Sequence, residues 1–144
     1  MKIKRCLQVV PHPAFASAAL LLLRLHMGAA LILHGWGKIQ SPFGWMGPDS
    51  PIPGFLQALA ALSEVGGGLA LILGLLTPIA ALGVAVTMAV AASFHIFVMK
   101  DPYVSTGGGS YELALGYLIL SILVIAMGPG RFSVDAKIFG NRSH

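Results

Sequence analysis

The chain has 144 residues, of which 56% are apolar and only 10% are charged. Soluble domains average about 25% charged residues, so this composition excludes a water-soluble globule and favours a bilayer as the solvent. The net charge of +4 does not indicate a nucleic-acid partner, because six of the nine basic residues lie near the two chain ends: Lys2, Lys4, Arg5, Arg131, Lys137 and Arg142.

Four apolar stretches approach the ~20 residues that a helix needs to cross ~30 Å of hydrocarbon. In chain order they cover residues 14–36, 55–76, 78–98 and 111–127, and none shows the alternating pattern of a strand. We therefore predict an all-α membrane protein, with a bundle of four transmembrane helices over residues 14–127 between basic tails at residues 1–13 and 128–144. Because positively charged flanks are retained inside, both termini are predicted to be cytoplasmic.

The connections between these stretches differ in length. Residues 74–78 form so short a link that the second and third helices must be an antiparallel hairpin, with Thr77 suited to the N-cap and Pro78 to the first helical position. Residues 38–54 and 99–110 are longer, rich in Pro and Gly, and lie on the opposite face. The first of these loops is predicted to cap the bundle at the level of the lipid headgroups.

The first two spans each carry a charged residue near mid-membrane, Arg24 and Glu64. Counted from the outer helix ends, the two differ in depth by only ~5 Å at ~1.5 Å per residue, which predicts a buried ion pair. Such a pair either fixes the bundle register or contacts a ligand, and the three glycines after Glu64 leave room for one. His26 points to the other side of the first helix from Arg24.

The remaining ionisable groups gather near the outer interface and predict the mouth of a polar pocket. Such groups can hydrogen-bond a quinone head group, relay a proton or bind a metal, although each also suits a plain interfacial role. No HxxxH or ExxH spacing is present, so no metal site is predicted, and a haem between two histidines is the weaker alternative. The predicted pocket comprises Arg24, His34, Lys38, Glu64, His95 and Glu112.

The order and spacing of five short motifs resemble the DoxX family of small bacterial membrane proteins. The resemblance covers about residues 20 to 136 and rests on Leu23-Arg24-Leu25 with Gly28, His34-Gly35-Trp36-Gly37-Lys38, Leu62-Ser63-Glu64 with Gly66-Gly67-Gly68, Leu73-Gly74-Leu75-Leu76-Thr77-Pro78, and Gly128-Pro129-Gly130-Arg131-Phe132-Ser133-Val134-Asp135. It implies a four-helix, multi-pass protein of the bacterial inner membrane, often associated with redox enzymes, some relatives being subunits of a thiosulfate:quinone oxidoreductase. The family supplies no catalytic motif, so no catalytic residue is assigned.

We therefore expect a membrane subunit of a quinone-linked redox system, in contact with the lipid bilayer and with other membrane or redox subunits. Cys6 is the single cysteine, which excludes an intrachain disulfide or a CxxC pair, so electrons must come through a bound cofactor, a quinone being the candidate, or through a partner. A homo-oligomer is compatible with the sequence. The alternative is a structural or assembly subunit without its own chemistry, and a small-solute carrier is disfavoured because four spans show no paired halves.

Overall fold

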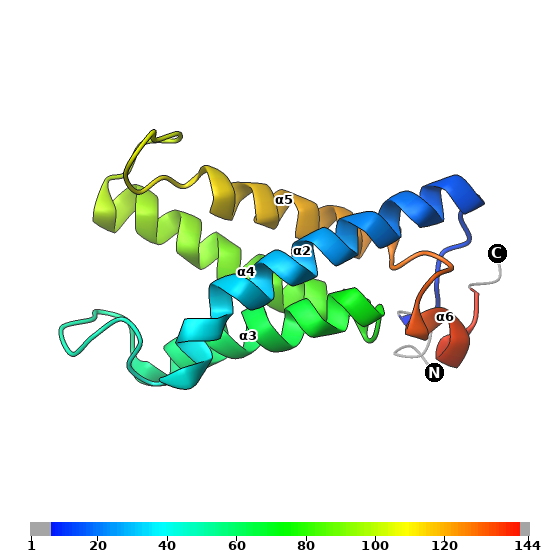
Figure 1. Cartoon of the computed structure of the whole chain (residues 1–144), viewed down its shortest axis with the longest axis horizontal. Coiled ribbons are helices and arrows are strands. Elements are labelled where there is room, and N and C mark those ends of the chain that lie inside the picture. The colour runs from blue at the N-terminus through cyan, green and yellow to red at the C-terminus, as the bar shows by residue number, and fades with distance from the viewer. Residues whose placement is uncertain (1–6, 142–144) are drawn as a thin grey trace.

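The structure is a computed structural model that describes residues 7–141; within this range its regular elements are helices, and one isolated bridge pairs Val9 with Asn141. The long helices run alongside one another (Figure 1). Loops 41–53 and 100–111 lie at one end, the loop end, and the turn between α3 and α4 lies at the other with α6, the α6 end. The elements are α2 (Ala14–Gln40), α3 (Gly54–Leu73), α4 (Thr77–Ser93), the π-helical η1 (Phe94–Met99), α5 (Glu112–Met127) and α6 (Val134–Phe139).

Glycines allow α2 to pack closely on α3. A Cβ atom added to Gly28 would lie 2.5 Å from the carbonyl oxygen of Gly68, and one added to Gly68 would lie 2.8 Å from the carbonyl oxygen of Gly28. Gly35 leaves similar space for Glu64, whose Cβ would lie 2.8 Å from the added atom. Small residues that bring helix backbones together are a main means of helix association in lipid.

The apolar core joins α2 and α3 to a second pair, α4 and α5. Its buried members come from all four long helices: Met27, Leu31, Leu71, Ala81, Val84, Met88, Tyr117 and Val124. Large apolar side chains also cover the outside, where Leu33 is 77% exposed and Leu22 is 68% exposed. An apolar exterior of this extent is suited to lipid rather than to water.

Three helical segments are long and apolar enough to cross a membrane: α2, α3 and the continuous segment Thr77–Met99 formed by α4 and η1. The fourth, α5, is equally apolar but has 16 residues. At ~1.5 Å per residue it spans about 24 Å of the ~30 Å hydrocarbon layer. The predicted all-helical membrane architecture is confirmed to this extent, while a complete crossing by α5 and the cytoplasmic position of the termini stay predictions.

Two local expectations change. Helix α2 continues to Gln40 instead of ending near residue 36, because the small and polar residues after Trp36 keep helical geometry. Thr77 is not the N-cap of α4: Leu76 holds that position in the left-handed region at φ 48°, and the Thr77 hydroxyl is buried without a hydrogen-bond partner among the described residues. Pro78, predicted for the first helical position, is therefore the second residue of α4, still within its first turn.

The described part of the C-terminal tail, residues 128–141, folds back against the α6 end. The Met127 carbonyl lies 2.7 Å from Nε2 of His12, and the Arg131 amide donates to the Ser17 hydroxyl. The Ser133 hydroxyl caps α6 by accepting from the Ala136 amide at 3.2 Å. The predicted tail residues Lys2, Lys4, Arg5, Cys6 and Arg142 lie outside the described range.

Candidate functional site

The six residues predicted for one polar pocket lie in separate surroundings. Lys38 and Glu64 meet between α2 and α3, and Arg24 lies nearer the α6 end. His34 is exposed on α2, while His95 belongs to η1. Of the six, Glu112 is the one that lines a groove large enough for a ligand.

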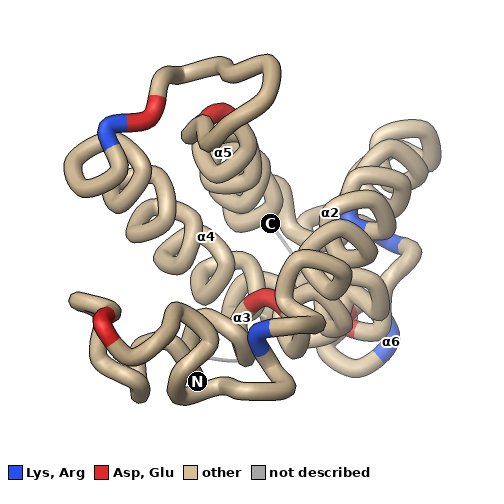
Figure 2. The backbone as a smooth tube through the Cα atoms, turned by 60° about the vertical axis from the view of Figure 1, so that its left-hand side comes forward, with Lys and Arg blue, Asp and Glu red and all other residues tan. Residues whose placement is uncertain are grey.

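Lys38 and Glu64 form an ion pair within the bundle. The Lys38 Nζ atom donates to Glu64 Oε1 at 2.6 Å, and Figure 2 shows a basic and an acidic segment meeting near α3. The Glu64 side chain is 4% exposed and that of Lys38 is 26% exposed. The second carboxylate oxygen, Oε2, is buried without a hydrogen-bond partner among residues 7–141, so the pair is only partly satisfied.

Loop 41–53 closes over this ion pair from the loop end. The Lys38 ammonium lies 4.7 Å from the centroid of the Trp45 ring, close enough for a cation–π contact. The loop is anchored to buried Gln57: the Trp45 indole donates to its carbonyl at 3.0 Å, and the Met46 amide donates to its side-chain oxygen at 3.0 Å. The predicted cap is therefore an ordered structure over a charged centre.

The predicted ion pair between Arg24 and Glu64 is wrong. The packing of α2 on α3 sets the register, because Gly35 lies directly against Glu64. At ~1.5 Å per residue Lys38 is only about 4.5 Å along α2 from Gly35, whereas Arg24 is about 16 Å away in the other direction, so Lys38 is the cation that reaches the carboxylate. Arg24 is fully buried and donates instead to backbone carbonyls, at 3.0 Å to Leu71 and 2.6 Å to Phe132.

Asp135 completes this second charged centre. Its carboxylate accepts from the amides of Leu76 at 2.7 Å and Thr77 at 2.9 Å, and so caps the start of α4 from the C-terminal segment. Its own amide donates to the Gly74 carbonyl at 2.8 Å. Gly74 has a φ of 65° and faces Arg24 so closely that an added Cβ would overlap the guanidinium. Arg24 and Asp135 thus join α2, the α3–α4 turn and α6.

His95 pairs with an acid that the sequence analysis did not assign to it. Its Nδ1 lies 2.6 Å from Oδ2 of Asp101, just beyond the π-helical turn η1. Asp101 in turn packs against Gly109, where a Cβ would overlap its carboxylate. The dyad therefore fixes the fold of loop 100–111, and His95 does not reach the pair formed by Lys38 and Glu64.

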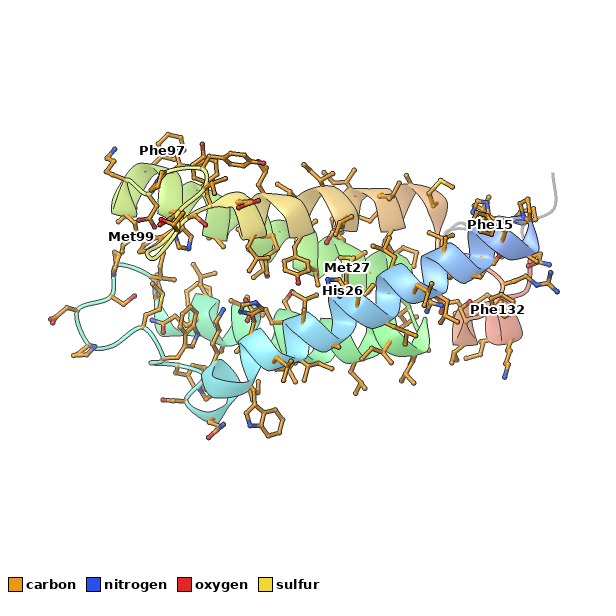
Figure 3. The ribbon with its side chains drawn as sticks, turned by 45° about the horizontal axis from the view of Figure 1, so that its top comes forward. Phe15, His26, Met27, Phe97, Met99 and Phe132 are labelled. Atoms are coloured by element: carbon orange, nitrogen blue, oxygen red, sulfur yellow. The ribbon has the colours of Figure 1, made fainter. Side chains whose placement is uncertain are left out.

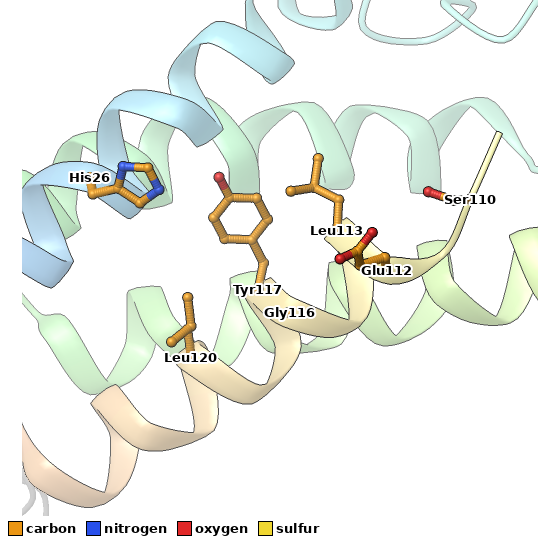
Figure 4. A pocket seen from close by; sticks show the side chains of 7 residues that line it. All are labelled: His26, Ser110, Glu112, Leu113, Gly116, Tyr117 and Leu120. Atoms are coloured by element: carbon orange, nitrogen blue, oxygen red, sulfur yellow. The ribbon is translucent and has the colours of Figure 1, made fainter. Parts of the chain in front are cut away.

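A groove of about 430 Å³ separates α2 from α5, which are not packed closely against each other. Figure 4 shows His26 on the α2 side and Tyr117 reaching from α5, with Glu112 nearer the loop end. Within residues 7–141, neither the His26 ring nor the Tyr117 hydroxyl has a protein hydrogen-bond partner. The groove has the size of a small-molecule site. Its lining residues are His26, Ser110, Glu112, Leu113, Gly116, Tyr117 and Leu120.

His26 and Tyr117 were not predicted from the sequence to line a groove. The available signal was an ionisable residue in the first span on the side away from Arg24, which marks a second polar helix face. What occupies the opposite wall depends on how α5 packs, and a single sequence does not contain that information. Among the described residues, no group of three His, Cys, Asp or Glu side chains is arranged to hold a metal ion.

Long apolar helices with paired charges between them define a multi-pass integral membrane protein. The DoxX family model matches residues 19–99, more than half of the chain, and the chain belongs to the DoxX family. It is 34% identical over 121 residues to the inner membrane protein YqjF of Escherichia coli strain K12, covering 80% of this chain and 88% of that protein.

A Haemophilus influenzae protein described as uncharacterized is 32% identical over 122 residues, covering 83% of this chain and 90% of its own length. No solved structure matches the chain. Family membership and the apolar helices together place the protein in the inner membrane as a multi-pass protein in contact with the lipid bilayer.

Proposed function

We propose that the protein is a membrane subunit of a quinone-linked redox system and binds the quinone head group in the groove between α2 and α5. The observation that carries this proposal is the combination of an apolar groove with unpartnered polar groups on its two sides, His26 from α2 and Tyr117 from α5. The groove occupies the loop-end half of α5, where Glu112 begins the helix.

The chemistry of a quinone matches these side chains. Each quinone carbonyl accepts a hydrogen bond, which the Tyr117 hydroxyl and the protonated ring nitrogen of His26 donate. Glu112 accepts a hydrogen bond from the hydroxyl of the reduced form. Leu113 and Leu120 contact the ring, and the isoprenoid tail leaves between α2 and α5 into the acyl chains.

In this proposal the protein supplies the quinone site, and a partner subunit supplies the electrons. The single cysteine excludes an internal dithiol as the electron donor. The partner is a redox protein of the membrane or its surface. The paired and capped charges of this chain support this division of roles, because they hold the helices in place and do not form a reactive centre.

The site is tested by changing one hydroxyl. Tyr117→Phe should weaken binding of a short-tailed ubiquinone analogue to the detergent-purified protein by roughly fivefold to tenfold, because a single hydrogen bond of about 1 kcal/mol is lost. Binding is measured by titration of the intrinsic tryptophan fluorescence. The matched control is Tyr103→Phe in the exposed loop, which should leave the affinity unchanged.

Two results would contradict the proposal. One is a purified protein that yields no quinone on extraction with organic solvent and shows no saturable binding of the analogue. The other is an affinity that Tyr117→Phe and Tyr103→Phe change to the same degree, since this would place the analogue outside the groove.

A structural or assembly subunit is the second candidate, favoured by the contacts that the buried charges make within the chain. Asp135 accepts two amide hydrogen bonds, and Lys38 neutralises Glu64. For such a subunit, His26→Leu and Tyr117→Phe would leave the activity of the assembled complex unchanged. Loss of that activity in a folded His26→Leu variant favours the quinone site.

We further propose that α5 completes a fourth crossing and that both termini are cytoplasmic. The basic residues at the α6 end support this orientation. In spheroplasts that express a Cys6→Ser background, a cysteine placed at exposed Thr106 should react with a membrane-impermeant maleimide, whereas one placed at exposed Asn141 should react only after permeabilisation. Labelling of both positions in intact spheroplasts would overturn the topology.

A further inference from the structure

The exposed charges at the α6 end are basic throughout the described residues. Arg131 and Lys137 are both exposed, one just before α6 and one within it. The acid at this end, Asp135, is fully buried and engaged with the start of α4. The sequence adds further basic residues close to both ends of the chain, in segments outside the described range.

Exposed apolar side chains stand beside these two cations. Phe132 is 45% exposed and Ile138 is 58% exposed, and each follows a basic residue directly in the chain. The Arg131 guanidinium lies 5.4 Å from the centroid of the Phe132 ring, and Figure 3 shows Phe132 beside α6. An exposed surface that alternates cationic and apolar groups is suited to the boundary between lipid headgroups and acyl chains.

The position of α6 holds this surface at the height of that boundary. Asp135 bonds to the amides of Leu76 and Thr77, where α4 begins its passage through the bundle, and to the carbonyl of Gly74, where α3 ends. The segment is therefore fixed at the end of the spanning helices and does not extend away as a free tail. Its exposed side chains face whatever surrounds the bundle at this level.

We propose that Arg131 and Lys137 bind the headgroup phosphates of anionic phospholipids, with Phe132 and Ile138 against the first carbons of the acyl chains. Basic groups at a membrane surface attract anionic lipids, and cationic positions beside spanning helices bind their headgroups. The absence of an exposed acid at the α6 end, within the described residues, leaves this attraction unopposed. This site is separate from the groove between α2 and α5.

The test uses the full chain reconstituted in an equal mixture of phosphatidylglycerol and phosphatidylcholine. After extraction in mild detergent, the retained lipids are quantified by mass spectrometry. The wild-type protein should retain phosphatidylglycerol preferentially, and the preference should fall roughly fivefold for each charge removed in Arg131→Gln and Lys137→Gln. High salt during extraction should reduce the wild-type preference in the same direction.

Two controls separate lipid binding from folding. Lys100→Gln removes an exposed basic residue at the loop end and should leave the preference intact. The exchange Arg131→Lys with Lys137→Arg keeps both charges and should also preserve it, while thermal unfolding in detergent verifies that every variant is folded.

A wild-type protein without a preference would overturn the proposal, as would a double Gln variant that keeps the wild-type preference. A third outcome would replace the lipid with an acidic protein surface: no lipid preference in any variant, together with a partner subunit whose co-purification is lost in the double Gln variant.

Discussion

Asp135→Ala should lower the free energy of unfolding by about 3 kcal/mol, because buried donors lose a charged acceptor and a buried cation loses its nearby counter-charge. The buried amide of Thr77 and the half-buried amide of Leu76 would lose their acceptors at the start of α4. Arg24 would keep its two carbonyl acceptors but lose the nearby negative charge. The measurement is thermal or denaturant unfolding in a mild detergent, followed by tryptophan fluorescence.

The matched control is Asp49→Ala, which removes an exposed carboxylate from the loop end and should change stability by less than about 0.5 kcal/mol. Asp135→Asn should lie between the two, since its side-chain oxygen accepts one of the two hydrogen bonds. If Asp135→Ala and Asp49→Ala change the free energy of unfolding by the same amount, the contacts of Asp135 do not stabilise the bundle.

The pair of Lys38 and Glu64 should respond unequally to the loss of either partner. Lys38→Met leaves the carboxylate, 4% exposed, without a cation and should cost about 3 kcal/mol. Glu64→Gln leaves an ammonium that is 26% exposed and can extend toward water or headgroups, so its cost should be about 1 kcal/mol. The burial of the residue left unpaired, and not its charge alone, thus decides which single variant loses more stability.

Combining the substitutions provides the decisive comparison. The double variant Lys38→Met with Glu64→Gln should be about as stable as Glu64→Gln alone, which corresponds to a coupling energy of about 3 kcal/mol. Lys100→Met at the exposed end of η1 is the control for loss of a basic residue and should have little effect. Additive costs in the double variant would show that the ion pair is not formed in the membrane protein.

The helices were predictable from the sequence because their main determinant is the length of each apolar run. The C-terminal end of α2 was misjudged for a local reason, since Trp36 to Gln40 are polar enough to suggest an interface yet continue the helix. The N-cap of α4 was misjudged for a nonlocal one: Thr77 fits the position by type, but Asp135, far along the chain, supplies the acceptors.

The candidate site was less predictable because it depends on the register between helices. Counting residues from the helix ends does not give this register, which is set by the close packing of Gly35 on Glu64 and brings Lys38 to the carboxylate in place of Arg24. The groove depends on a further quantity, the separation of α2 from α5. Glu112 lines this groove without the five residues predicted to share its pocket, and its neighbours His26 and Tyr117 became visible only in three dimensions.

The contacts of Arg24 also impose an order on assembly. The Leu71 carbonyl belongs to the next helix, but the Phe132 carbonyl and Asp135 are made about 110 residues after Arg24. During synthesis, α2 and α3 therefore enter the bilayer while Arg24 has one of its two carbonyl acceptors, and the other follows only after α4 and α5 have been made. The segment with Phe132 and Asp135 thus fastens α2 to the α3–α4 turn only after all four long helices have been synthesised.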